Sequence, residues 1–324
     1  MKTRIAVLTG LGALSQEVNH LAESLPHEHV CYAIEPWFPQ LSSMTRRIAH
    51  PWAGASHDPG IVQINPFLFE EIERVLTAEA KTTHMFFTGD FPSDRFRQAS
   101  FYGGRIERFG DDLAVELFNQ TPTELTPPVR YFLALGLLLD RLKIERLLAC
   151  QIFPQLNVRA GCATVTVPPA KILRSISRLF LEALQAVAAT KQSSYRLSQA
   201  AVIDEGEQPA VERLGTDSLV REVGRRRRKS FPILVKPPSV EFDPALDQPT
   251  IGPKTMDECA AAGIRGVLFC AETTTFVQRE EAIRVADSRG VFLYGMPFSQ
   301  LCELYEQSFP RTWARNRSIA PLHR

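Results

Sequence analysis

Short apolar runs alternate with segments of helical periodicity along the whole chain, and this alternation limits the fold most strongly. In the first half, the apolar runs are "RIAVLTG", "HVCYAIE" and "THMFFTG", and helical spacing follows in "LGALSQEVNHLAESL" and "RYFLALGLLLDRLK". A helix between two strands returns the chain to the same edge of a sheet, so the alternation predicts parallel strands. We therefore predict an α/β fold with a Rossmann-like N-terminal domain over residues 1–160.

The second half repeats the alternation after a segment without clear periodicity, "NVRAGCATVTVPP" at Asn157–Pro169. Strands are predicted in "FPILVK", "RGVLFCAE" and "VFLYGMP", and helices in "AKILRSISRLFLEALQAVAAT", "GPKTMDECAAAGI" and "QREEAIRVADSRG". The turn "EGE" between "SQAAVID" and "QPAVER" predicts a hairpin. We predict a separate mixed α/β C-terminal domain over residues 161–297 and a polar tail, without assigned elements, over 298–324.

Composition excludes several classes of protein. The 324 residues carry a formal net charge of +1, so no global field favours nucleic acid, and we predict no nucleic-acid partner. The six cysteines are widely spaced and form no CxxC pair, which indicates a reducing cytoplasm and no zinc site. The most apolar stretch, "YFLALGLLLDRL", is too short to span a bilayer. Any contact with lipid is therefore expected to be peripheral.

Two glycine-containing turns are candidate phosphate sites. Gly10 and Gly12 follow a predicted strand and open a predicted helix, where backbone N–H groups can face a phosphate. A bare Gly-x-Gly turn is as often structural, and position 15 holds Ser15 where the dinucleotide pattern needs a third glycine. The run Gly215-Thr216-Asp217 has the same ambiguity, because threonine and aspartate also cap helices.

The segment from Val235 to Thr255, "VKPPSVEFDPALDQPTIGPKT", concentrates acids between a predicted strand and a predicted helix. Asp243 and Asp247 cannot both cap the helix that starts near Pro253. Carboxylates in a proline-stiffened loop suit a hard divalent cation such as Mg²⁺. A solvated acidic loop is the alternative.

The same segment resembles the LpxI family of UDP-2,3-diacylglucosamine pyrophosphatases. The residues in register with the family pattern are Lys236, Pro238, Asp243, Asp247, Pro249, Gly252, Pro253 and Thr255. The run "QAAVIDEGEQPAVERLGTDSLVREVG" and the closing "AAAGIRGVLF" and "REEAIRVADSRGVFLYG" are also similar to the family. Weaker similarity covers the first half, including "GDD" at Gly110–Asp112.

The resemblance implies an enzyme, its substrate and its site. It implies Mg²⁺-dependent hydrolysis of the pyrophosphate of UDP-2,3-diacylglucosamine to UMP and lipid X in lipid A synthesis, with two domains around the substrate. Asp247 takes the catalytic role, and Asp217, Asp243 and Asp247 are the implied metal ligands. The residues assigned to substrate binding are Gly10, Gly12, Gly215, Thr216, Lys236, Thr250 and Gly252. The expected partner is a UDP-linked glycolipid, the expected location is the cytoplasm beside the inner membrane, and a homodimer is left open.

Several positions depart from the family pattern. Leu214 stands where the family has glutamate before "GTD", and Cys270, Glu272 and Thr273 replace glutamate, glycine and lysine. These replacements support an alternative, a re-purposed relative that binds a nucleotide-like ligand without catalysis. For the lipid, we expect the apolar face of the Ile172–Val187 helix to shelter acyl chains and the basic run Arg225–Lys229 to attract an anionic surface.

Overall fold

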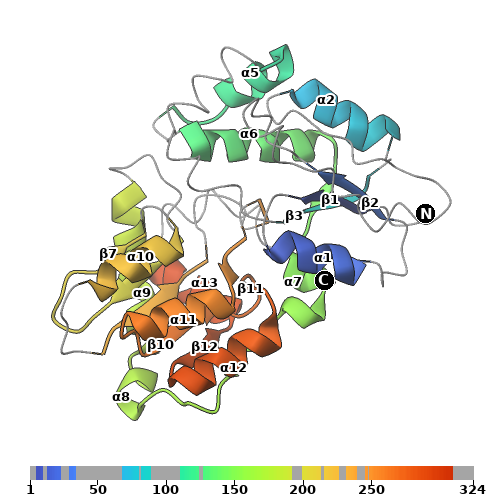
Figure 1. Ribbon diagram of the computed structural model, residues 1–324. Helices are drawn as coiled ribbons and strands as arrows, with labels where there is room; N and C mark the ends of the chain where they lie inside the picture. Colours follow the sequence, from blue (N-terminus) through green and yellow to red (C-terminus); the bar gives the residue numbers. More distant parts are fainter. Residues whose placement is uncertain are drawn as a thin grey trace. The chain divides into compact units, whose positions relative to one another are not determined.

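The chain forms two compact units, Met1–Ala149 and Cys150–Arg324, both mixed α/β (Figure 1). The computed structural model describes residues 5–9, 13–22, 29–33, 68–79, 82–88, 110–123, 127–191, 199–212, 215–225, 231–238, 245–246 and 248–308. The prediction of an α/β protein is confirmed at this level. Among the described helices, none combines the length and apolar character that crossing a bilayer requires.

The first unit contains a four-stranded parallel sheet in the order β2-β1-β3-β4. Its strands are β1 (Ile5–Thr9), β2 (His29–Ala33), β3 (His84–Thr88) and β4 (Glu145–Arg146). Helix α1 (Ala13–Ala22) lies on one face, and α2 (Phe69–Arg74), α5 (Asp112–Asn119) and α6 (Pro127–Arg141) lie on the other (Figure 1). A π-helical segment, Val75–Glu79, extends α2. The strands and helices predicted here are found, and the Rossmann-like assignment stays a prediction.

Asp111, in the "GDD" run, has a structural role in this unit. One carboxylate oxygen accepts from the backbone N–H of Ala114 at 2.8 Å, which caps α5. The other accepts from the backbone N–H of Glu70 at 2.7 Å in the first turn of α2. One side chain thus satisfies free N–H groups at the start of two helices.

The second unit contains a six-stranded mixed sheet in the order β5-β12-β10-β8-β6-β7. Strands β8 (Ile233–Lys236), β10 (Gly266–Cys270) and β12 (Phe292–Met296) are parallel to one another. Strand β6 (Ala201–Ile203) pairs antiparallel with β8 and with β7 (Ala210–Val211), which confirms the predicted hairpin. Strand β5 (Gly161–Cys162) runs antiparallel to β12. A separate pair, β9 (Thr250–Ile251) and β11 (Thr275–Phe276), is parallel.

Helices cover both faces of this sheet. On one face lie α10 (Thr216–Gly224), α11 (Pro253–Ala261) and α12 (Arg279–Arg289), and on the other lie α9 (Ile176–Lys191) and α13 (Phe298–Ser308) (Figure 1). Alternate residues of each strand enter the two cores: Leu234 faces α10–α12, and its neighbours Ile233 and Val235 face α9. Burial on both sides explains why these strands read as continuous apolar runs.

Three expectations about helices need correction. The segment predicted as one helix from Ala170 is two, α8 (Ala170–Leu173) and α9, separated at Arg174 and Ser175. The apolar face expected to shelter acyl chains is core: Ile176, Phe180 and Val187 are buried against the sheet. The start of the predicted tail forms α13, in which Leu301 is fully buried. Leucine and tyrosine side chains at helical spacing pack the helix Phe298–Ser308 into the second unit.

The three parallel strands give the sheet two distinct edges. At the amino-terminal edge lie the segments that lead into these strands, the β6–β7 turn, the 163–169 loop and α8. At the carboxyl-terminal edge lie Lys236 at the end of β8 and the turn after Cys270.

Gly266 provides a test of how tightly the sheet packs. A Cβ at this position would lie 2.0 Å from the ring of Phe292, its partner on the adjacent strand. We expect Gly266→Ala to lower the free energy of unfolding by about 1–3 kcal/mol through overpacking. Urea denaturation measures this. The double variant Gly266→Ala/Phe292→Leu should recover part of the loss, and additive losses would contradict the clash.

Candidate functional site

Lys236 is the centre of the candidate site. It ends strand β8, and only 3% of its surface is exposed. Its ammonium donates to the hydroxyl oxygen of Thr216 at 3.0 Å and to the backbone carbonyl of Thr250 at 2.9 Å. A buried lysine needs such acceptors, because burial disfavours an unpaired charge. Among the described residues, its third N–H has no acceptor, so one donor is available for a ligand.

Gly215 and Thr216 bring a helix start to this lysine. Gly215 precedes α10 with φ of 95° and ψ of 154°, a conformation open mainly to glycine. Thr216 is the first residue of the helix, and its hydroxyl accepts from Lys236 instead of capping α10. Among the described residues, no side chain caps the start of α10, so its first N–H groups can face an anion.

Thr250 and Gly252 bring a second helix start to the same edge. Thr250 lies in β9, and Gly252 immediately precedes α11, whose first residue is Pro253. No side chain caps α11 either. The position of β9 is fixed by β11, with Thr250 opposite Thr275, whose hydroxyl donates to the side chain of Gln248 at 2.9 Å. A buried cation and two uncapped helix starts make a site suited to an anion such as a phosphate.

A second buried charge lies near Lys236. Glu212 follows β7, is 7% exposed, and accepts from the backbone N–H of Gln199 at 3.1 Å. Burial raises the pKa of Glu212, and the charge of Lys236 acts in the opposite direction. Lys236 therefore opposes, without overcoming, the effect of burial on the charge of Glu212. Sequence reasoning missed Glu212, although an acid directly after the apolar strand Ala210–Val211 was a usable signal.

Asp217 is engaged in an ion pair. Its carboxylate lies 2.9 Å from the ammonium of Lys254, and this pair raises the pKa of Lys254. Glu258 lies 3.9 Å from both Lys254 and Arg221. One oxygen of Glu258 is buried and has no hydrogen-bond partner among the described residues. Burial, followed by the charge of Asp217, raises the pKa of Glu258.

The described residues do not by themselves form a metal site. Within them, no three histidine, cysteine or carboxylate side chains are close enough together to hold an ion. Asp217, the one predicted ligand that is described, is paired with Lys254. Gly10, Gly12, Asp243 and Asp247 lie outside the described residues. The structure thus brings together Gly215, Thr216, Lys236, Thr250 and Gly252, and the metal ligands stay a prediction.

The replacements after β10 have structural roles. Glu272 accepts from the backbone N–H of Phe298 at 2.7 Å, at the first residue of α13. A carboxylate at a helix start is stabilised by the free N–H groups and the helix dipole. Thr273 is 4% exposed and Cys270 is fully buried, so the three replacements serve packing and capping. Burial raises the pKa of Cys270 to about 12, which keeps the thiol protonated.

We predict that Thr216→Val destabilises the protein. The change keeps the shape of the side chain and removes the acceptor for the buried ammonium of Lys236. The expected loss is about 1–3 kcal/mol in the free energy of unfolding, measured by urea denaturation. Thr216→Ser keeps the hydroxyl and serves as the matched control. Equal stability of the valine variant and wild type would contradict the role of this hydrogen bond.

Glu258 should contribute a pH dependence of stability. Because its pKa is raised in the folded state, the folded protein binds more protons than the unfolded chain above the ordinary value of 4.5. The free energy of unfolding should therefore fall as pH rises from that value through the raised pKa. Glu258→Gln should flatten this part of the profile, whereas Glu306→Gln, an exposed control on α13, should not. A steeper profile in Glu258→Gln would reverse the assigned sign.

The second unit is similar in sequence to a known protein family. Residues 169–294 match the family model described as the LpxI C-terminal domain. The chain is also similar to UDP-2,3-diacylglucosamine pyrophosphatase LpxI of Caulobacter vibrioides, with 36% identity over 109 residues. That alignment covers 31% of this chain, and the chain spans about two fifths, 39%, of the length of that relative.

The matched segment contains every described residue of the candidate site, from Glu212 to Glu272. The residues that build the anion site thus lie within the matched segment. Residues 169–294 of the second unit are therefore similar to the LpxI C-terminal domain.

Proposed function

We propose that the protein hydrolyses the pyrophosphate of UDP-2,3-diacylglucosamine to UMP and lipid X, in lipid A synthesis. The observation that carries the proposal is Lys236, which is buried between the starts of α10 and α11 and has, among the described residues, an acceptor for only two of its three N–H groups. A pyrophosphate is anionic, so attack of water on phosphorus requires that charge to be neutralised. The similarity to the Caulobacter pyrophosphatase supports this substrate class.

The residues of this chain have separable roles in the proposed reaction. Lys236 neutralises charge on a phosphate oxygen, and Thr216 and Thr250 hold its ammonium in place. The N–H groups at the starts of α10 and α11 supply further donors without cost of reorganisation. Asp247, in the proline-containing loop that precedes Thr250, positions the attacking water or takes its proton. The role of Asp247 is inferred from the family pattern alone, and no contact of a described residue supports it.

The proposed hydrolysis requires Mg²⁺, and this requirement has its own measurement. The cation would supply charge neutralisation and a more acidic water when bound. Asp243 and Asp247 have the oxygen chemistry that Mg²⁺ prefers. To bind the ion, the carboxylate of Asp217 would have to leave its ion pair with Lys254. Within the part of the chain that the structure describes, no cluster of side chains could hold the ion.

Turnover should depend on Asp247 without a matching loss of stability. We expect Asp247→Ala to lower UMP release by about 10²–10⁴-fold, the usual cost of losing a general base. Asp257→Ala, which removes an exposed carboxylate on α11 paired with Arg289, is the matched control and should retain turnover. UMP release from UDP-2,3-diacylglucosamine and the melting temperature are measured on the same preparation.

The same assay separates the two functions that the sequence leaves open. Loss of UMP release on chelation, restored by Mg²⁺, supports the metal-dependent hydrolase. The alternative is a re-purposed relative, which is favoured by Thr273 in place of the family's lysine. Binding of a uridine nucleotide by wild type, with no UMP release at any Mg²⁺ concentration, would establish that alternative and exclude the hydrolase.

A further inference from the structure

An open pocket lies at the amino-terminal edge of the second sheet, at the opposite end of β8 from Lys236. Its volume is about 420 Å³, which is within the range of small-molecule sites. The apolar part of its lining consists of Val167, Pro169, Phe231 and Phe292. Two polar side chains and a glycine complete the described lining, namely Thr166, Arg265 and Gly290. An apolar cavity with a few polar groups is typical of a site for a small organic ligand.

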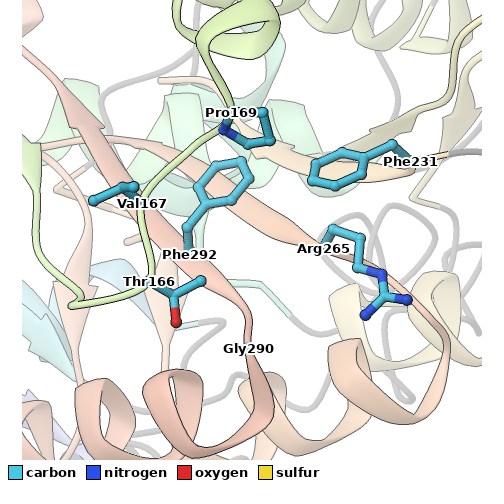
Figure 2. Close-up of a pocket in the computed structure, with 7 residues that line it drawn as sticks. All are labelled: Thr166, Val167, Pro169, Phe231, Arg265, Gly290 and Phe292. Atoms are coloured by element: carbon cyan, nitrogen blue, oxygen red, sulfur yellow. The ribbon is translucent and has the colours of Figure 1, made fainter.

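Two phenylalanine rings form the floor of the pocket (Figure 2). The rings of Phe231 and Phe292 are stacked, with centroids 6.4 Å apart and an angle of 17° between their planes. Phe292 is buried, and its ring lies so close to Gly266 that a Cβ there would be 2.0 Å away. Phe231, by contrast, is 39% exposed. An aromatic ligand can therefore lie against the exposed part of Phe231 and extend the stack from a fixed base.

The charged group of the described lining is the guanidinium of Arg265. The backbone of Arg265 is fixed on both sides, since its N–H donates to the carbonyl of Pro232 at 3.0 Å and its carbonyl accepts from the N–H of Phe292 at 3.1 Å. Figure 2 shows the guanidinium on the Phe231 side of the pocket. Among the described residues, no carboxylate pairs with it. An anion bound beside the rings would therefore meet an arginine that these residues leave unpaired.

The negative side chains at the same edge do not line the pocket. The acids of the β6–β7 turn are Asp204, Glu205 and Glu207, and none of them belongs to the described lining. Asp287, which lies against the 163–169 loop, accepts from the backbone N–H of Thr166 at 3.0 Å and is also outside the lining. The edge as a whole carries both signs of charge, but the described lining presents a positive charge to a ligand.

We propose that this pocket binds a small aromatic carboxylate. The phenylalanine rings supply a stacking face, and a guanidinium pairs with a carboxylate through two parallel hydrogen bonds. One guanidinium matches the single charge of a carboxylate, whereas a phosphate group carries more charge and three acceptor oxygens. Thr166, whose hydroxyl has no partner among the described residues, offers a further polar contact. The pocket is separate from the site proposed for hydrolysis, and its assignment does not rest on that function.

Titration of the chain with 2-naphthoate, followed by saturation-transfer difference NMR, tests the charged part of the site. We expect saturable binding by wild type. The neutral analogue 2-naphthalenemethanol should bind about fivefold more weakly, the effect of losing an exposed ion pair, and Arg265→Ala should weaken naphthoate binding by a similar factor. Arg284→Ala is the matched control, because Arg284 is an exposed arginine on α12 whose partner is Glu281 on the same helix. Its affinity for naphthoate should equal that of wild type.

The aromatic floor is tested by a second variant. Phe231→Leu keeps an apolar side chain and removes the stacking ring, so naphthoate binding should fall about three- to tenfold. Leu173→Ala is the matched control, because it removes an exposed apolar side chain that lies outside the lining. Phe231 and Arg265 are both exposed, so the melting temperatures of their variants should stay close to that of wild type. Cyclohexanecarboxylate, which has the charge without the aromatic ring, should bind wild type more weakly than naphthoate.

Two outcomes would overturn the proposal. The first is the absence of saturable naphthoate binding by wild type at millimolar concentrations. The second is wild-type affinity in both Arg265→Ala and Phe231→Leu, which together with displacement by pyrophosphate would place the anion beside Lys236 instead. UMP release keeps the test independent of the proposed reaction. Naphthoate binding by a chain that releases no UMP would leave the pocket site standing and remove the hydrolase, and UMP release without naphthoate binding would do the reverse.

Discussion

Burial of strands β8, β10 and β12 on both faces is the constraint on which the second unit depends. Helices α10–α12 cover one face and α9 with α13 cover the other, and alternate strand residues fill the two cores. A sheet with two covered faces has room for polar chemistry only at its edges. Both proposed sites follow from this, since one lies where these strands end and the other where they begin.

The two edges solve opposite problems of burial. At the carboxyl-terminal edge, a charge is placed in the interior: Lys236 is held by Thr216 and Thr250, with the buried carboxyl of Glu212 nearby. At the amino-terminal edge, apolar groups are placed in solvent: Thr164 is tied to the core, and Val165 and Val167 are exposed. Each arrangement costs stability in isolation.

The departures from the family pattern are explained by contacts that sequence comparison does not contain. An acid in the turn after β10 is unfavourable beside a phosphate when only charge is considered. In the structure, Glu272 accepts from the first N–H of α13, a helix that the sequence left without assignment. The dipole and free N–H groups of that helix stabilise the carboxylate. The negative charge of Glu272 is therefore stabilised by the start of α13.

The sequence by itself determined the alternating elements, the hairpin at Glu205 and the placement of Lys236 at a strand end, because local periodicity and turn residues encode these features. Tertiary structure decided which faces are buried. The apolar stripe of α9 could cover either lipid or sheet, and packing against β6 and β8 assigned it to the core. It also decided that Asp217 pairs with Lys254 and that Glu212 lies near Lys236. Such contacts join residues distant along the chain, so no local pattern specifies them.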